Sequence, residues 1–534
     1  MTGGSGKGST AITDGLIRSV GDIPRHHAQV RPEATALVFE GRASSYARWN
    51  DRASQVANAL IGDGCGPAAR VALFAKNSDW YYEIYGGTAK SNTVLVGVNW
   101  RLAAPEVAQV IRDSDAGILF VAPEFAPVID QIKDELGAVR RIITLGPARG
   151  DWLGYEDWLA AASSRDPMVP VSPQDVAIQL YTSGTTGLPK GVMLTNENIL
   201  EALKAVEAGV YGVLDAGNER ILMCMPNFHI AGSNWGMFGF AIGAAVHVLK
   251  EVDPVRILET IEREKITRAL FVPAVIMLLV QHPLAKTTDF SSLKTVVYGA
   301  SPAPFDLLRQ AMATFGCGLA QAYGLTETCG TVVSLPEADH EPGGNKRMHS
   351  CGKPLPGTTI RIVDGEGADL PPHTVGEILI RSKLNMAGYW KRPEDTAKSF
   401  VGDWFRSGDA GYLDEDGYLY IHDRVKDMIV SGGENIYPAE IESALFGHPA
   451  IADVAVIGVP DDKWGEAVKA VVVLKPGQAV EAAELIAFAK ARIAGYKVPK
   501  SVDFAPVLPR NPSGKLLKRE LRRPYWEGRD RQVN

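Results

Sequence analysis

The chain has 534 residues, more than one hydrophobic core normally organises, so its length predicts two or more domains. Hydrophobic residues make up 46% and charged residues 22% of the sequence, as in an ordinary globular enzyme. The net charge of −7 argues against a nucleic-acid partner, because binding to a phosphate backbone requires a basic surface. The five cysteines are scattered without a C-x-x-C pair, which predicts free thiols, no zinc site and a reducing, cytoplasmic location.

The first third of the chain alternates between helical and strand patterns. Residues 1–10 carry no apolar stretch typical of a secretory signal, and Thr2 excludes N-myristoylation. Apolar residues recur at helical spacing from Tyr46 to Leu60, before Gly62 and Gly64. Short β-rich runs follow at 71–74, 94–98, 118–121 and 142–145, with helical patterns between several of them. This alternation predicts parallel sheets with crossover helices.

The stretch LYTSGTTGLPKGVMLT (180–195) has the composition of a phosphate-binding loop. Glycines let backbone N–H groups approach an anion, hydroxyls add donors, and a lysine adds positive charge. We expect a strand before this stretch and a helix that starts just after Thr195. The spacing differs from a Walker A loop, since Lys190 lies three residues after Gly187 and precedes Gly191. A surface turn rich in small polar residues is the alternative.

Residues 226–249 begin with PNFHIAG and continue as an apolar, glycine-rich stretch. A lone buried histidine such as His229 is more often structural than catalytic, but this one could also stand in a pocket wall. Residues 230–249 contain no acid, lysine or arginine and are long enough to span a bilayer. Because Ser233, Asn234 and His247 are polar and no second span accompanies them, we predict a buried helix followed by a buried strand. Peripheral membrane contact is left open.

Two short motifs follow, YGASPAP (298–304) and YGLTET (323–328). The small residues of the first leave room against a planar ligand, although by themselves they indicate only a turn that needs glycine. In the second, Glu327 lies between two threonines, and a carboxylate beside hydroxyls suits a Mg²⁺ that also touches phosphate. Tyr323 offers a ring for a base to stack on. The alternative is a polar loop end with a core tyrosine.

The segment WFRSGDAGYLDEDGYLYIHDRVKD (404–427) precedes a change in character. We expect Asp409 on a tight turn, where it accepts both hydroxyls of a ribose or, alternatively, caps its own backbone. After 424–426 comes an α+β pattern of domain size, with a helix opened by Pro438, strands at 454–459 and 468–474, a helix at 482–493 and a strand-like tail. The predicted domains are 1–425 and 426–534.

Near the end, LPRNPSGKLLKREL (508–521) carries Lys515 after Gly514, followed by further basic residues. From charge alone, a solvated basic tail is the preferred interpretation.

Four motifs, YTSGTTGLPKG, YGLTET, SGDAGYLDEDGYLYIHDRVKDMI and NPSGKLLKREL, stand in the order found in one family. The chain resembles the adenylate-forming superfamily of acyl-CoA synthetases, peptide-synthetase adenylation domains and beetle luciferases, from about residue 20 to 525. The resemblance implies an α/β multidomain fold. Its large N-terminal part has two α/β subdomains and a small distorted β-barrel, and a small mobile α+β domain follows. It also implies a carboxylate joined to ATP with release of pyrophosphate, then transferred to a thiol, usually that of coenzyme A.

The resemblance also implies a role for each matching residue. It places Lys515, Thr326, Glu327 and His229 in catalysis, with Glu327 as the Mg²⁺ ligand, Lys426 at the hinge, and Ser431, Gly432, Gly433 and Glu434 near coenzyme A. It assigns ATP or AMP to Thr182, Ser183, Gly184, Thr185, Thr186, Gly187, Lys190, Gly299, Ala300, Ser301, Tyr323, Gly324, Thr326, Asp409 and Arg424. The expected acyl pocket contains His229, Ser233, Trp235, Phe238, Tyr298 and Cys329, and we expect Gly232, Gly236 and Gly239 to open space for an acyl chain.

Three functions are compatible with these motifs: an acyl-CoA synthetase, an adenylation enzyme that loads a carrier protein, and a non-catalytic or oxygenase homologue. Amino-acid-activating relatives place an aspartate where this chain has Phe228 and His229, so we expect an acid without an ammonium group. The presence of Lys515, Glu327 and Asp409 argues against a non-catalytic homologue, and no feature of the sequence supports an oxygenase. We favour a medium- or long-chain fatty acid, with an aryl acid of the benzoate or cinnamate type, or a short functionalised acid, as alternatives. A homodimer is left open.

Overall fold

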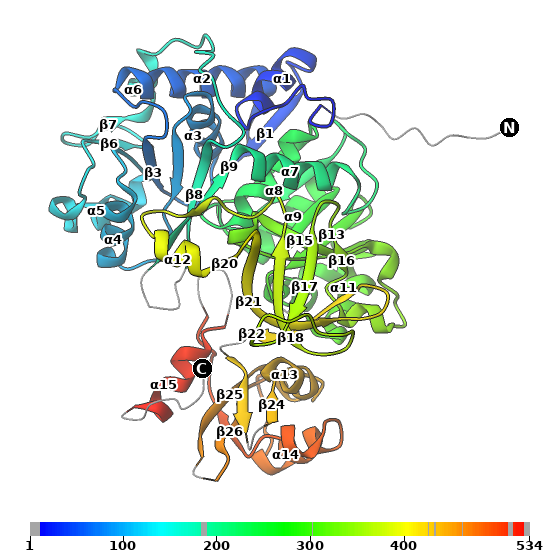
Figure 1. The fold of residues 1–534 in the computed structure, drawn as a ribbon. Helices are drawn as coiled ribbons and strands as arrows, with labels where there is room; N and C mark the ends of the chain where they lie inside the picture. The colour runs from blue at the N-terminus through cyan, green and yellow to red at the C-terminus, as the bar shows by residue number, and fades with distance from the viewer. Residues whose placement is uncertain are drawn as a thin grey trace.

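The computed structural model of this chain describes residues 11–182, 189–301, 303–424, 427–431, 434–461, 463–510 and 516–527. Its strands form four sheets (Figure 1). Three of these sheets use strands from 35–424 only, and the fourth uses strands from 429–504 only. The predicted α/β multidomain fold, with a large N-terminal part and a smaller C-terminal unit, is confirmed.

The first large sheet has eight strands in the order β19-β9-β8-β4-β3-β5-β6-β7. Strands from β8 to β7 run parallel, and β9 and β19 are antiparallel additions at one edge. All four β-rich runs of the first third are strands here, as predicted. The strands are β3 (Arg70–Phe74), β4 (Val94–Gly97), β5 (Ile118–Val121), β6 (Arg141–Thr144), β7 (Leu153–Gly154), β8 (Val176–Thr182), β9 (Lys190–Thr195) and β19 (Gly388–Tyr389). The helices are α1 (Asp22–Val30), α2 (Tyr46–Gly62), α3 (Asp79–Lys90), α4 (Ala104–Ser114), α5 (Ala126–Gln131) and α6 (Tyr155–Ala160).

The second large sheet has nine strands in the order β16-β15-β14-β13-β12-β10-β11-β1-β2, parallel from β14 to β1. The carboxyl ends of its parallel strands therefore meet at one edge, where open α/β sheets bind ligands. The strands are β1 (Thr35–Phe39), β2 (Arg42–Ser45), β10 (Arg220–Met223), β11 (Ala245–Val248), β12 (Arg268–Phe271), β13 (Thr295–Gly299), β14 (Gly318–Leu325), β15 (Gly330–Leu335) and β16 (Lys353–Pro354). The helices are α7 (Asn196–Glu207), α8 (Ile230–Ala241), α9 (Pro254–Arg263), α10 (Pro273–Gln281) and α11 (Phe305–Phe315).

One hydrophobic core joins the helices between these two sheets. Trp49 of α2 packs against Phe240 of α8 at a ring distance of 4.3 Å, and Tyr82 of α3 meets the same phenylalanine at 4.9 Å. The apolar stretch 230–249 is thus a buried helix, α8, followed by a buried strand, β11, as predicted. Among the described residues, every helix is too short or too polar to span a membrane.

The third sheet is antiparallel and corresponds to the expected distorted barrel. Its strands are β17 (Thr359–Val363), β18 (Gly376–Arg381), β20 (Phe400–Val401), β21 (Trp404–Leu413) and β22 (Leu419–Arg424), and α12 (Pro393–Lys398) lies between β19 and β20 in the chain. Strand β21 is the centre of this sheet, since it pairs with β18, β20 and β22.

The C-terminal unit lies beyond the third sheet, away from the two large ones (Figure 1). Pro438 is the first residue of its first helix, as predicted. The strand-like tail is β27, but the expected basic tail is partly a helix, α15. The elements are β23 (Ile429–Ser431), β24 (Glu434–Ile436), α13 (Pro438–Phe446), β25 (Ile451–Asp461), β26 (Gly465–Leu474), α14 (Ala482–Lys490), β27 (Ser501–Phe504) and α15 (Lys518–Trp526). The division at 425/426 stays a prediction, because both residues lie outside the described ranges.

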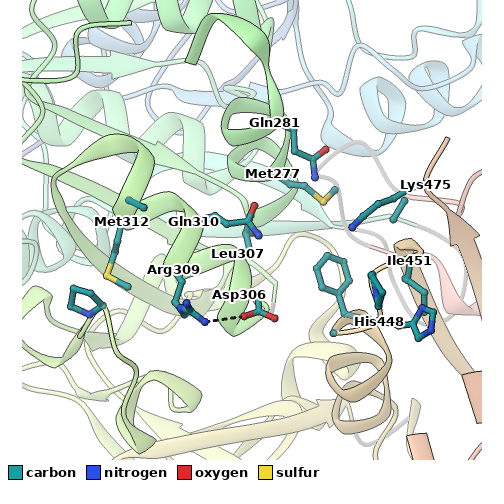
Figure 2. Close-up of a pocket in the computed structure, with 16 residues that line it drawn as sticks. Met277, Gln281, Asp306, Leu307, Arg309, Gln310, Met312, His448, Ile451 and Lys475 are labelled. Carbon is teal, nitrogen blue, oxygen red and sulfur yellow. Dashed lines mark ion pairs between the residues drawn. The ribbon is translucent and has the colours of Figure 1, made fainter. Parts of the chain in front are cut away.

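A cavity of about 570 Å³ separates the C-terminal unit from α10 and α11 (Figure 2). Met277 and Leu307 line it from the large part, and Phe446, Ile451 and Lys475 line it from the C-terminal unit. The apolar clusters of the C-terminal unit contain only residues from 429 onward. Among the described residues, the hydrophobic clusters on the two sides of this cavity are therefore separate.

Candidate active site

The predicted phosphate loop is the connection of a β-hairpin. Strands β8 and β9 pair antiparallel, and Thr182 lies opposite Lys190 at the loop end. The helix expected just after the stretch 180–195 is α7, which begins at Asn196, but the strand β9 inside the stretch was not predicted. The loop residues Ser183, Gly184, Thr185, Thr186 and Gly187 lie outside the described residues.

Lys190 is already held in place by two neighbours from one distant segment. Its Nζ lies 3.0 Å from Oδ2 of Asp395 and 5.0 Å from the centre of the Tyr389 ring. The lysine side chain is 15% exposed, so it can still reach a ligand at the mouth of the hairpin.

Glu327 lies in a short 3₁₀ turn, Thr326–Thr328, that follows β14. Its Oε1 accepts hydrogen bonds from the hydroxyls of Tyr389 (3.0 Å) and Thr182 (3.4 Å). The neighbouring Thr328 does not supply the expected hydroxyl, because its buried side chain bonds to the backbone of Leu325 and Gly330 instead. The hydroxyls that contact this carboxylate thus come from other strands.

The surroundings of Glu327 fit a magnesium ion that is bound mainly by substrate. Among the described residues, no group of three or more Asp, Glu, His or Cys side chains could hold a metal. Mg²⁺ usually keeps several waters and takes one or two carboxylates plus substrate phosphates. One carboxylate close to Thr182, at the base of the predicted phosphate loop, matches that pattern.

Tyr323 and Asp409 are joined directly. The Tyr323 hydroxyl donates to Oδ2 of Asp409 at 2.8 Å, and burial, together with the Asp409 charge, raises the pKa of Tyr323 well above its ordinary value. The expected tight turn at Asp409 is wrong: it lies within the ten-residue strand β21, where only Gly408 takes a positive φ of 68°. Register places the Cα of Arg424 opposite that of Asp409, so both predicted ribose residues share one cross-strand pair.

The segment Gly299–Ala300–Ser301 leaves β13 beside the end of β14. A side chain on Gly299 would collide with the carbonyl of Ala322, so this glycine is required by strand packing. Ala300 has a positive φ of 67°, which bends the chain sharply at the edge of the sheet. Gly324 is required in the same way, because a Cβ there would collide with the Gly330 carbonyl.

His229 stands at the N-cap of α8 with its ring against Phe228. Burial, with the positive charge of Arg101 adding to it, lowers the pKa of His229 to about 4, so the ring is neutral at pH 7. Its buried Nε2 has no hydrogen-bond partner in the described part of the protein. A buried polar atom without a partner is costly and is usually explained by a ligand, an ion or water.

The glycines of α8 do not open space for an acyl chain, contrary to expectation. A Cβ on Gly236 would collide with the Tyr82 ring, one on Gly232 with the carbonyls of Met225 and Pro226, and one on Gly239 with Val246. These glycines let α8 approach its neighbours closely, so the volume is filled by protein.

The other predicted acyl-pocket residues are all buried to 4% exposure or less: Ser233, Trp235, Phe238, Tyr298 and Cys329. The Trp235 Nε1 donates to the Leu222 carbonyl at 3.0 Å, and the Tyr298 hydroxyl lies 3.0 Å from Nε2 of His340. Because these polar atoms are used inside the protein, both side chains pack as core residues, and their contact with an acid stays a prediction.

Several predicted residues cannot be placed. Lys515, Lys426, Gly432 and Gly433 lie outside the described residues. Ser431 and Glu434 are Cα partners that face each other where β23 meets β24.

Two residues that contact the predicted ATP site were missed by the sequence analysis: Tyr389 and Asp395, in the segment GYWKRPED (388–395). Its glycine, proline and charged residues are typical of an ordinary loop and helix start. The pairing of β19 with β9 brings this segment to Lys190, and the hydrogen bond from the Met386 amide to the Glu327 carbonyl brings it to Glu327.

Comparison with known proteins gives close matches over nearly the whole chain. Residues 24–390 match the AMP-binding enzyme family, and residues 440–515 match the AMP-binding enzyme C-terminal domain. The fatty acid–[acyl-carrier-protein] ligase ScoC of Streptomyces coeruleorubidus is 41% identical over 95% of this chain and 96% of its own length. A feruloyl-CoA synthase of Amycolatopsis sp. is 38% identical over 95% of this chain and 99% of its own. The structure of anthranilate CoA ligase AuaEII with anthranoyl-AMP matches with a TM-score of 0.88 and 28% identity, over 95% of this chain and 97% of that one.

Proposed function

The chain belongs to the AMP-binding enzyme family and is an acid–thiol ligase, and we propose that it joins a medium- or long-chain fatty acid to coenzyme A. The observation that carries the ATP-dependent step is the meeting of Thr182, Lys190 and Glu327 at the loop end of the β8–β9 hairpin. A hydroxyl, a cation and a carboxylate at one loop suit a nucleotide triphosphate with its magnesium ion.

In the first step, the acid oxygen attacks the α-phosphate of ATP and pyrophosphate leaves. The carboxylate is already a nucleophile at neutral pH, so no general base is required. We assign the ribose to Asp409 and Arg424, the adenine to Tyr323 and the 299–301 segment, and the phosphates to the hairpin loop with Lys190. Glu327 would hold Mg²⁺, which when bound offsets the charge on the phosphate oxygens. Lys515 would bridge the acid and the α-phosphate.

In the second step, a thiol attacks the acyl-adenylate and AMP leaves. One face of the adenylate cannot host both Lys515 and a thiol, so we propose that the unit 426–534 rotates about Lys426 between the steps. The rotation would bring the segment 431–434 towards the pantetheine arm. The separate core of this unit and the cavity beside α10 and α11 support the movement.

The acid would approach along the N-terminal end of α8, where the Nε2 of His229 has no hydrogen-bond partner among the described residues. Residues 226–242 contain no acidic side chain to pair with a substrate ammonium group, which supports an acid without one. The fatty-acid substrate is further supported by the similarity to ScoC, which is named a fatty acid–[acyl-carrier-protein] ligase. An aryl acid is the second candidate, because the feruloyl-CoA synthase is nearly as similar and Tyr82 narrows the space beside Gly236.

The deciding experiment measures pyrophosphate release with ATP, Mg²⁺ and a panel of acids: fatty acids of graded length, aryl acids, short branched or thioether acids, and amino acids. Each is run without acceptor, with coenzyme A, and with a phosphopantetheinylated carrier protein. We expect continuous turnover with a fatty acid only when coenzyme A is present. If turnover requires the carrier protein, the acceptor is a carrier protein and not coenzyme A. If aryl acids are turned over fastest, the substrate is an aryl acid and not a fatty acid.

A further inference from the structure

Tyr389 touches both charged groups at the predicted phosphate site. Its hydroxyl donates to Oε1 of Glu327 at 3.0 Å, and the Nζ of Lys190 lies 5.0 Å from the centre of its ring. One side chain therefore contacts the carboxylate that would hold the metal and the cation that would hold phosphate.

The backbone around Tyr389 is fixed on both sides of this contact. Tyr389 is the Cα partner of Val192 in β9, and the amide of Trp390 donates to the Gly191 carbonyl at 2.8 Å. The amide of Met386 donates to the backbone carbonyl of Glu327 at 2.8 Å. The same short segment thus holds the main chain that carries Lys190 and the main chain that carries Glu327.

The Tyr389 hydroxyl can only donate to this carboxylate. Tyr389 is only 9% exposed, so this hydrogen bond is largely shielded from water. An ionised carboxylate only accepts hydrogen bonds, so the proton lies on the tyrosine and fixes one oxygen of Glu327. The ring face meanwhile offers Lys190 a cation–π contact beside its ion pair with Asp395.

Resting on the proposed function, we propose that Tyr389 is a positioning residue that sets the separation of Glu327 and Lys190 and so presents both to the phosphates of magnesium-bound ATP. The hydroxyl and the ring have separable tasks. The hydroxyl orients Glu327, so it affects nucleotide binding only when the metal is present. The ring supports Lys190, so it affects nucleotide binding with or without the metal.

The test is equilibrium binding of the fluorescent nucleotide mant-ATP, titrated with MgCl₂ or in EDTA, without any acid. In Tyr389→Phe, we expect magnesium-dependent binding to weaken about tenfold, the effect of losing one hydrogen bond to a charged group. Binding in EDTA should equal wild type. In Tyr389→Leu, which also removes the ring, binding in EDTA should weaken too. Melting temperatures verify that each variant is folded.

Tyr155→Phe is the matched control. The buried Tyr155 hydroxyl donates to Oε2 of Glu83 at 2.9 Å, so the same substitution removes the same kind of bond among residues that have no part in the proposed site. Both titrations of this variant should follow wild type.

A double-mutant cycle separates positioning from general support of the fold. Adding Tyr389→Phe to Glu327→Gln should change mant-ATP binding less than twofold, because the group it orients is already gone. Equal magnesium dependence in wild type and Tyr389→Phe, or full additivity with Glu327→Gln, would overturn the proposal.

These outcomes are distinct from failure of the proposed function. If wild type binds mant-ATP with magnesium but activates no acid in the panel, the ligase substrate is wrong and the role of Tyr389 is still judged by binding. If wild type does not bind mant-ATP, both proposals fall.

Discussion

The hydroxyl of Tyr323 and the carboxylate of Asp409 are joined by a 2.8 Å hydrogen bond between β14 of the second large sheet and β21 of the barrel-like sheet. Asp409 is 7% exposed, and its own amide donates to Oγ of Ser407 at 3.0 Å. The proposed ribose ligand is thus oriented before the nucleotide arrives.

This pair predicts the effect of Tyr323→Phe. Removing the hydroxyl should raise the KM for ATP about tenfold with a smaller change in kcat, because one charged hydrogen bond that orients Asp409 is lost. The measurement is pyrophosphate release at varied ATP. Tyr418→Phe is the control, since it removes a hydroxyl that donates to Asp339 at 2.9 Å outside the proposed site. An unchanged KM for ATP in Tyr323→Phe would show that Tyr323 does not orient Asp409 for nucleotide binding.

Lys515→Ala should abolish adenylation and spare the thioester step from pre-made acyl-adenylate. The reason is that the lysine offsets the repulsion between acid and phosphate only in the first step. The two half-reactions are measured separately, as ATP–pyrophosphate exchange and as thioester formation. Arg519→Ala, which removes an exposed cation of α15, should leave both intact. Equal loss of both half-reactions in Lys515→Ala would contradict the assignment.

Lys426→Pro should stiffen the proposed hinge, because proline fixes φ and removes an amide donor. We expect one half-reaction to slow far more than the other, measured on the same two assays. Unchanged rates in both would move the hinge to another residue.

Buried histidines predict a loss of stability in mild acid. Burial lowers the pKa of His27 to about 4, so the unfolded chain takes up the proton first as the pH falls below about 6.5. Stability is therefore complete above that pH and declines toward pH 4, by about 2 kcal/mol for one such group between pH 7 and pH 5.

The variant His27→Gln checks this expectation. Glutamine can still donate to the Ala241 carbonyl, which His27 Nε2 contacts at 2.9 Å, but it does not titrate. The difference between the unfolding free energies at pH 7 and pH 5, from urea titrations, should shrink by about 2 kcal/mol. His349→Gln, at an exposed position, should not change it. If the pH dependence of the unfolding free energy is the same in His27→Gln and wild type, His27 is not the source of the loss of stability in acid.

Close packing of α8 predicts that Gly236→Ala destabilises the protein by about 1–3 kcal/mol, because a methyl group there overlaps the buried Tyr82 ring. Thermal unfolding measures the loss. In a Tyr82→Leu background, which removes the ring, the same substitution should cost less. If Gly236→Ala lowers the stability equally in both backgrounds, the destabilisation does not come from overlap with the Tyr82 ring.

Local patterns predicted the strands β3 to β6 and the α2 helix, and the apolar stretch 230–249 predicted the α8–β11 pair, whereas β1, β2 and β7 were not predicted. In each predicted element, local apolar spacing and the final burial agree, so propensity and packing favour the same structure. The motif at 180–195 was recognised by composition, and the strand before it and the helix after it were predicted, but the strand β9 inside it was not. Apolar residues at 190–195 suit either a strand or a helix, and only pairing with β8 decides between them.

The residue types of the site could be read from the chain because phosphate, ribose and carboxylate chemistry each needs particular groups in a short motif. The residues that contact these groups in the folded protein could not be read from the chain. Tyr389 meets Glu327, and Tyr323 meets Asp409, across separations of 62 and 86 residues. Such contacts arise from sheet pairing and register, which depend on the packing of the whole fold. The same packing filled the space beside Gly236 with Tyr82, so the volume left for an acid is a property of the tertiary structure and not of any motif.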